Sequence, residues 1–150
     1  GIDLICACDI RLAEQSTLFS VRETRMGIIA DLGTLQRLPR IIGDGHSREL
    51  AFTGRDFYAP EAFRLGLISQ VFEGRSNLYS EAEAVARQVA DNPPLTVQGV
   101  KEVINYSRDS DIEDSLRYTA QKSVSALLTE DFREAIRAFK EKRKPRFTGK

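Results

Sequence analysis

Hydrophobic and polar positions alternate over two short segments near the beginning of the chain. Residues 9–13 and residues 17–21 follow this alternation and carry β-branched side chains, which predicts two short strands joined by a turn at residues 14–16. The apolar segment at residues 67–72 predicts a further strand. Residues 2–8 are also apolar, apart from one acidic side chain, and their period favours neither helix nor strand.

The spacing of apolar residues changes to a helical period after a loop at residues 22–33. One helical face covers residues 34–42 and ends at Gly43, since glycine is common where helices stop. Pro39 predicts a disturbance or a restart within this helix. Two shorter helices are predicted from the same kind of spacing, at residues 46–53 and 59–66.

Four apolar stripes with helical spacing fill the second half of the chain. Thr129 is predicted to cap the last helix, with Glu130 and Asp131 in its first turn. Short strands and loops followed by helices indicate an α/β fold, which we divide into a core part, residues 1–75, and a helical part, residues 76–150. The four stripes lie within residues 78–89, 95–104, 112–127 and 132–139.

The composition and the charge of the chain limit the kinds of molecule that it is expected to bind. The chain has 150 residues with 22 basic and 22 acidic side chains, so its formal net charge is zero. This balance argues against nucleic acid or a membrane surface as the main partner, and no apolar run reaches the roughly 18–20 residues that cross a bilayer. Cys6 and Cys8 lie too close together for a disulfide framework, and nothing completes a zinc site. An apolar segment that starts at residue 1 predicts that a further part of the protein precedes it.

Three acidic residues near the beginning of the chain are candidates for chemistry. Asp3 interrupts an apolar segment, Glu23 follows a predicted strand, and Asp31 follows an apolar patch. An ionised carboxylate costs several kcal/mol to bury unless it is paired or hydrogen-bonded, and burial raises its pKa toward neutrality. Acids in such surroundings suit general acid–base catalysis.

Each of these acids also has a structural interpretation. The interpretations are a helix cap for Asp3, an ion pair with Arg22 or Arg25 for Glu23, and a cap of the following helix for Asp31. The single histidine, His46, is predicted at a helix start, and Ser47 belongs to no G-x-S-x-G motif, so a serine hydrolase has no support. Spacing alone leaves the catalytic and the structural interpretations of the acids open.

Several stretches of the chain resemble a known family in the same order. Residues 1–11 are similar to a Gly-x-(Glu/Asp)-Leu-x-x-x-Cys-Asp-x-Arg motif, and residues 33–43 are similar to a Gly-Thr-x-x-Arg-Leu-Pro-Arg-x-x-Gly signature. Both occur in the crotonase, or enoyl-CoA hydratase/isomerase, superfamily, and residues 50–55, 62–71 and 129–143 continue the resemblance. The resemblance implies a crotonase-like α/β fold, with this chain as the C-terminal portion of its ββα superhelix followed by a helical trimerisation region.

Within the superfamily, the acids resemble those of one branch. Dienoyl-CoA isomerases carry Asp, Glu and Asp where this chain has Asp3, Glu23 and Asp31. The resemblance implies that Glu23 removes the C2 proton of a 3,5-dienoyl thioester, that Asp31 supplies the C6 proton, and that Asp3 orients the pocket. It implies substrate binding by Gly1, Ile28, Ile29 and Lys142, the last through CoA phosphates from a neighbouring subunit.

The resemblance also implies partners. The substrate would be an acyl-CoA thioester, with no separate cofactor or metal because coenzyme A is part of the substrate. A full-length homotrimer or homohexamer is implied, and a cytoplasmic location is favoured over peroxisomal or mitochondrial alternatives. Two other functions stay open. One is a 2-enoyl-CoA hydratase in which Asp3 and Glu23 activate water, and the other is a non-catalytic homologue that serves as an assembly or binding module.

Overall fold

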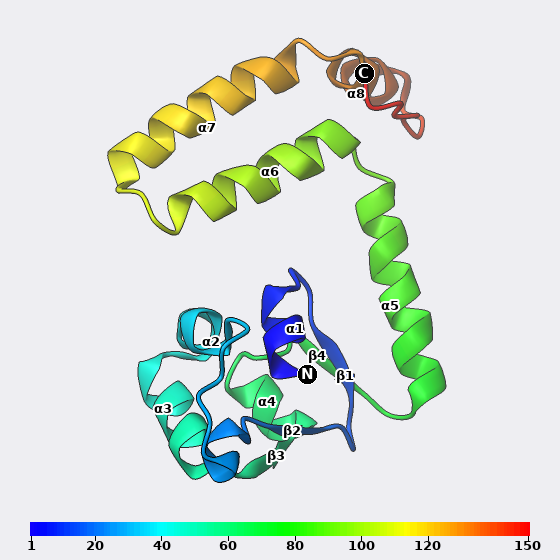
Figure 1. The fold of residues 1–150 in the computed structure, drawn as a ribbon. Coiled ribbons are helices and arrows are strands. Elements are labelled where there is room, and N and C mark those ends of the chain that lie inside the picture. Colours follow the sequence, from blue (N-terminus) through cyan, green and yellow to red (C-terminus); the bar gives the residue numbers. More distant parts are fainter. The chain divides into compact units, whose positions relative to one another are not determined.

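Short strands and helices alternate in the first part of the chain, and helices alone make up the second part (Figure 1). The computed structural model describes residues 1–150, which divide into two compact units, Gly1–Glu83 and Ala84–Lys150. The first elements are α1 (Ile2–Ala7), β1 (Leu12–Glu14), β2 (Leu18–Ser20), the 3-10 helix η1 (Glu23–Met26), α2 (Thr34–Ile42), α3 (Asp44–Thr53), β3 (Asp56–Tyr58), α4 (Ala59–Arg64) and β4 (Gln70–Phe72). They are followed by α5 (Arg75–Ala90), α6 (Pro94–Ser107), α7 (Ile112–Leu127) and α8 (Glu130–Glu141).

Two pairs of strands join distant segments of the first unit. β1 runs parallel to β4, with Ala13 opposite Val71, and β2 runs antiparallel to β3, with Phe19 opposite Phe57. The Phe19 and Phe57 rings stack with their centroids 5.5 Å apart. The core around them buries its apolar side chains almost completely, and the largest of these are Phe57, Leu38, Leu50 and Leu67. Burial of this kind is the main source of stability in a unit of this size.

The helical period predicts most helices correctly. α2 runs without a break from Thr34 to Ile42, so the disturbance predicted at Pro39 does not occur. Proline removes one backbone donor, but Leu38 and Ile42 are buried on the same face and hold the helix in place. The four helices predicted in the second half are confirmed as α5 to α8, and Thr129 caps α8 by accepting a hydrogen bond from the Phe132 amide at 3.1 Å.

The strand predictions are only partly correct. The strand predicted at residues 9–13 is β1 and begins only at Leu12, and the strand predicted at residues 67–72 is shortened to β4. Residues 2–8, whose period was undecided, form the helix α1 over most of their length. The pattern predicts neither β3 nor η1. Elements of three or four residues contain too few positions for a period, and their limits are set by partners far along the chain.

The second unit consists of amphipathic helices. α6 and α7 lie side by side as a hairpin (Figure 1). The Tyr106 ring of α6 and the Tyr118 ring of α7 stack with their centroids 4.3 Å apart. Lys122 of α7 pairs with Glu102 of α6. No residue of either helix is buried, and no helix of the chain combines the length and the apolar content that a membrane crossing requires. The division between the units falls within α5, and the domain boundary predicted after residue 75 stays a prediction.

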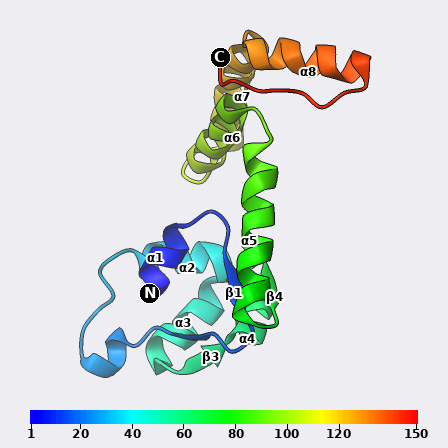
Figure 2. The same ribbon diagram turned by 90° about the vertical axis from the view of Figure 1, so that its right-hand side faces the viewer.

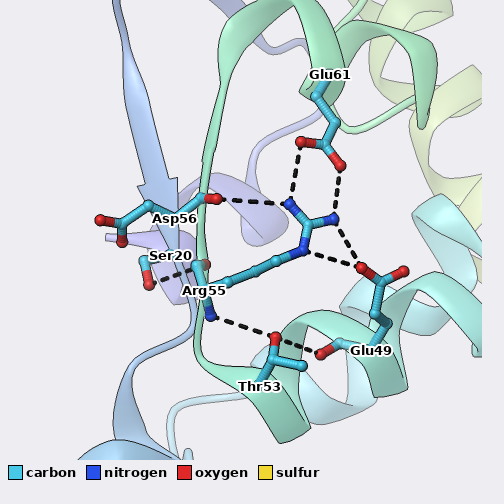
Figure 3. A network of polar contacts seen from close by, with 6 residues as sticks. All are labelled: Ser20, Glu49, Thr53, Arg55, Asp56 and Glu61. Carbon is cyan, nitrogen blue, oxygen red and sulfur yellow. Dashed lines mark hydrogen bonds and ion pairs between the residues drawn. The ribbon is translucent and has the colours of Figure 1, made fainter.

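Arg55 ties the end of α3 to the start of α4 (Figure 3). Its guanidinium group donates to both carboxylate oxygens of Glu61, at 2.6 and 3.1 Å, and to Glu49 at 2.9 Å. These hydrogen bonds hold the pKa of the Glu61 carboxyl below its ordinary value. The Ser20 hydroxyl donates to the Arg55 carbonyl oxygen at 3.3 Å, so the same residue also fixes β2.

Replacing Arg55 with methionine is expected to lower the free energy of unfolding of the full-length protein by about 1–2 kcal/mol, because Glu61 loses a bidentate partner. Thermal or urea unfolding measures the change. The matched control is Arg48→Met, which breaks the exposed pair of Arg48 with Asp44, and it is expected to cost less than about 0.5 kcal/mol. Equal losses in the two variants would mean that the Arg55 network adds nothing beyond a surface ion pair.

Candidate active site

Hydrogen bonds to α3 fix the position of η1, which begins with Glu23. The Thr24 hydroxyl donates to the carbonyl oxygen of Ala51 at 2.7 Å. The Arg25 side chain donates through Nε to the carbonyl oxygen of Thr53 at 3.1 Å. Two consecutive side chains after Glu23 are therefore anchored on one helix of the core, which limits the movement of the Glu23 backbone.

The chain is also fixed on either side of η1. The Arg22 guanidinium donates to both carboxylate oxygens of Asp56, at 2.5 and 2.7 Å, and lowers the pKa of that carboxyl. After η1, the Ile28 amide donates to the Glu23 carbonyl oxygen at 3.1 Å. This turn requires a left-handed residue, which Gly27 provides with φ of 71°. Glu23 therefore has a defined backbone position although it lies outside any long helix or strand.

The Glu23 side chain has a buried oxygen, Oε2, that has no hydrogen-bond partner. The ion pair with Arg22 or Arg25 considered from the sequence is not formed, because both arginines are bound elsewhere. A buried acceptor without a donor is unfavourable for folding, and such groups are concentrated at functional sites. Because no protein donor occupies Oε2 of Glu23, its lone pairs are not used by a hydrogen bond within the chain.

The Asp3 carboxylate accepts hydrogen bonds from the protein, in contrast to Oε2 of Glu23. Its Oδ1 accepts hydrogen bonds from the Thr34 hydroxyl at 2.6 Å and from the Thr34 amide at 3.1 Å. Asp3 does not cap its own helix, where Gly1 is the N-cap without a side-chain hydrogen bond. It instead satisfies the first amide of α2 and so joins α1 to α2. The Thr34 hydroxyl lowers the pKa of Asp3, which favours the ionised carboxylate.

Replacing Thr34 with valine is expected to lower the free energy of unfolding at neutral pH by about 1 kcal/mol, through loss of the hydroxyl donor to Asp3. Because the folded pKa of Asp3 lies below its unfolded value, the stabilisation is complete above about pH 4 and is lost as pH falls through the folded pKa. The difference from the unmodified protein should therefore shrink in acid, as urea unfolding at several pH values will measure. Thr53→Val is the control, because the Thr53 hydroxyl donates to a backbone carbonyl. A loss for Thr34→Val that does not change with pH would contradict the role of Asp3.

A loop leads from η1 to α2 (Figure 2). The sequence places Asp31 on this loop. Its side chain is exposed, and it does not cap α2, since Asp3 takes the Thr34 amide. On the same loop, Ile28 and Ile29 are 55% and 80% exposed. The loop therefore exposes an acidic side chain and, two and three residues before it, two apolar side chains.

The end of this loop explains part of the Gly-Thr-x-x-Arg signature. Gly33 has φ of 105°, and a Cβ placed there would lie 1.9 Å from Nη1 of Arg37. Arg37 in turn donates to the Leu32 carbonyl oxygen at 3.2 Å and closes the loop onto α2. Glycine is therefore favoured by the left-handed backbone, whereas the Arg37 guanidinium group, at the far end of a flexible side chain, could move aside for a Cβ.

The remaining predicted site residues are exposed. Gly1 is the N-cap of α1, and its carbonyl oxygen accepts a hydrogen bond from the Ile5 amide at 3.1 Å. Lys142 belongs to the second unit and follows α8 in a left-handed conformation with φ of 52°. Within the first unit, Thr34 connects Asp3 to the end of the loop that carries Asp31, whereas no hydrogen bond joins Glu23 to either aspartate.

The residues that position the acids were not found from the sequence. The role of Thr34 could have been predicted, because this residue follows Gly33 at a helix start. There the amide and the hydroxyl of a threonine both need a hydrogen-bond acceptor. No feature of the sequence predicts the pairing of Arg22 with Asp56, since the two residues lie 34 positions apart. Thr24 is likewise defined only by the carbonyl group that α3 brings to it.

The sequence of this chain is similar to those of one protein family. A family model described as enoyl-CoA hydratase/isomerase matches residues 1–150. A mitochondrial Delta(3,5)-Delta(2,4)-dienoyl-CoA isomerase of Dictyostelium discoideum is 44% identical over 147 residues, covering 98% of this chain and 50% of that protein. A peroxisomal protein of the same name from Arabidopsis thaliana is 44% identical over 147 residues, covering 98% of this chain and 53% of that protein.

The solved structures agree with this result. The crystal structure of an enoyl-CoA hydratase from Bacillus anthracis matches with a TM-score of 0.97 and 37% identity, covering 100% of this chain and 58% of that chain. The chain spans about half the length of the curated relatives it matches. It therefore forms part of a crotonase-like α/β fold. Since the family model matches from the first residue to the last, the chain belongs to the enoyl-CoA hydratase/isomerase family.

Proposed function

We propose that the full-length protein carrying this chain converts 3,5-dienoyl-CoA thioesters to their 2,4 isomers. The observation that carries the proposal is the buried Oε2 of Glu23, an acceptor that no protein donor occupies. The 44% identity to two proteins named as dienoyl-CoA isomerases favours this reaction over others of the family.

In the proposed mechanism, the Glu23 carboxylate accepts a proton from C2 of the substrate. The electron pair of that C–H bond forms the C2–C3 double bond, the C3–C4 double bond moves to C4–C5, and the C5–C6 pair takes a proton at C6 from the carboxyl group of Asp31. The reaction gains and loses one proton, and exchange with solvent returns both acids to their starting forms. Two carboxyl groups are needed because one side chain does not easily reach both carbons.

Asp3 has a different role in this proposal. Its carboxylate accepts two hydrogen bonds from Thr34 and has a lowered pKa, so it is poorly suited to exchange protons with a substrate. We assign it to holding α1 against the start of α2 and to shaping the pocket. Aspartate is shorter than the glutamate of hydratases, which leaves more room for the acyl chain.

Four residues are proposed to bind the substrate, namely Gly1, Ile28, Ile29 and Lys142. Ile28 and Ile29 would contact the acyl chain and exclude water from the dienolate, which favours isomerisation over hydration. Gly1 would lie beside the thioester, close to the backbone donors of the oxyanion hole. Lys142, which is exposed, would bind a phosphate group of the CoA held by a neighbouring subunit.

An enoyl-CoA hydratase is the second candidate, because a protein named as such in Bacillus anthracis matches with a TM-score of 0.97. The two functions are separated by assaying the full-length protein with a 3,5-dienoyl-CoA and with a 2-enoyl-CoA. The isomerase predicts the rise in ultraviolet absorbance that accompanies conjugation of the diene to the thioester. Efficient hydration of the 2-enoyl substrate without conversion of the diene would reject our proposal.

The helical part is proposed to form a trimer or a dimer of trimers in the full-length protein. α6 and α7 expose apolar side chains, among them Val100, Ile104 and Leu116, and bury none. Surfaces of this kind are normally covered by another part of the protein or by a second copy.

The proposed cellular compartment is the cytoplasm, the mitochondrion or the peroxisome. The mitochondrial and peroxisomal relatives support the second and the third of these.

A further inference from the structure

Lys142 is the only residue other than glycine that has a positive φ, at 52°. It ends α8 in a Schellman motif, in which the Arg143 amide donates to the Ala138 carbonyl oxygen at 3.1 Å and the Lys142 amide to that of Phe139 at 3.3 Å. Glycine normally occupies this position because a side chain is strained there. Strained residues persist where neighbouring contacts hold them, and they are concentrated at functional sites.

Those contacts come from the C-terminal strap, which we define as residues 143–150. The strap runs back along α8 (Figure 2) and returns to its first turn, where the Glu130 amide donates to the Lys150 carbonyl oxygen at 2.7 Å. Asp131, which is 1% exposed, accepts hydrogen bonds from the Thr148 amide at 2.7 Å and from the Gly149 amide at 2.9 Å. One end of the strap is therefore fixed by a buried carboxylate.

The other end is fixed directly beside Lys142. The Arg143 guanidinium donates to both carboxylate oxygens of Glu134, at 2.5 and 3.0 Å, and the Arg146 amide donates to the same carboxylate at 3.0 Å. The Glu134 side chain is only 16% exposed. These hydrogen bonds lower the pKa of Glu134 to about 2, so its carboxylate is ionised at any physiological pH. We call the pair of Glu134 with Arg143 the clamp.

The surface around the turn is positively charged. Glu141 is the only acidic residue among positions 140–150, and its carboxylate pairs with Arg143 at 2.6 Å. The exposed cationic side chains near Lys142 are Lys140, Lys144 and Arg146. A lysine whose backbone is held in such a field suits a phosphate group, since the direction in which its side chain leaves the turn is set before the anion binds.

We propose that Glu134 and Arg143 are positioning residues, which hold the strained turn and thereby direct the Lys142 ammonium to a phosphate group of the CoA ligand. The inference rests on the proposed function in its assignment of Lys142 to CoA. It adds that the lysine is oriented by the clamp and that affinity for the phosphates depends on two residues that do not touch them.

The test uses the full-length protein and two thioesters with the same acyl group, one of CoA and one of pantetheine, which lacks the nucleotide phosphates. Glu134→Gln and Arg143→Gln are each expected to raise KM for the CoA thioester roughly tenfold, with kcat unchanged. KM for the pantetheine thioester should not change. Glu130→Gln is the matched control, because it breaks the pair of Glu130 with Arg133 on the same helix, and it should alter neither KM.

A second comparison removes the ammonium but keeps the turn. In a Lys142→Gly background, Glu134→Gln should have no further effect on KM for the CoA thioester. Equal rises in KM for the two thioesters, or an additive effect in the glycine background, would overturn the inference. Calorimetric affinity for free CoA repeats the comparison without turnover, so failure of the proposed reaction is distinguished from failure of the clamp.

Discussion

Replacing Glu23 with glutamine is expected to lower kcat for a 3,5-dienoyl-CoA by roughly 10³-fold, with KM within about threefold of the unmodified protein. Glutamine has the shape of glutamate but cannot accept the C2 proton. The hydrogen bonds that fix η1 involve Thr24, Arg25 and Arg22, so they survive the substitution. Steady-state kinetics of the full-length protein measures the loss.

The control for this variant is Glu14→Gln. The Glu14 carboxylate accepts hydrogen bonds from the Ser16 hydroxyl and, at 2.8 Å, from the Ser16 amide, which lower its pKa and give it an ordinary structural role. Its replacement should leave kcat unchanged. If Glu23→Gln retained full isomerase activity while Tm stayed constant, Glu23 would not be the base and the mechanism would need another acceptor.

Replacing Asp31 with asparagine is expected to lower isomerase activity by about 10²–10³-fold, because no acid then delivers the proton to C6. Since Asp31 is exposed, Tm should stay the same. Proton abstraction at C2 by Glu23 should survive, so exchange of the C2 hydrogen with deuterated water is expected to continue in the variant. Turnover assays and NMR of the recovered substrate measure these two steps separately.

Asp44→Asn is the control for Asp31, because it also changes an exposed aspartate near the start of a helix. It should not affect either step. The hydratase alternative makes the opposite prediction for Asp31→Asn, namely that activity toward the physiological substrate changes little. Loss of both C2 exchange and turnover would instead indicate that Asp31 takes part in binding.

Helices could be predicted from the sequence where one of their faces is apolar and packs against the core. Residues 34–42 have Leu38 and Ile42 on the same side, and both are buried, so the helix follows from the spacing alone. The pattern does not predict β3, because three residues are too few to show a hydrophobic period. Its partner strand, β2, also lies in a distant part of the chain. The disturbance predicted at Pro39 does not occur, because packing of α2 against the core outweighs the local preference of proline.

The ordered motifs at residues 1–11 and 33–43 are enough to identify the family, and the amino-acid pattern also indicates Asp3, Glu23 and Asp31 as candidate acids. The differences between these acids become visible only in the folded chain. Asp3 is held by Thr34, whereas an oxygen of Glu23 is buried without a donor. The physical reason is that the state of a carboxylate depends on its nearest donors, and here folding brings those donors from distant positions in the chain.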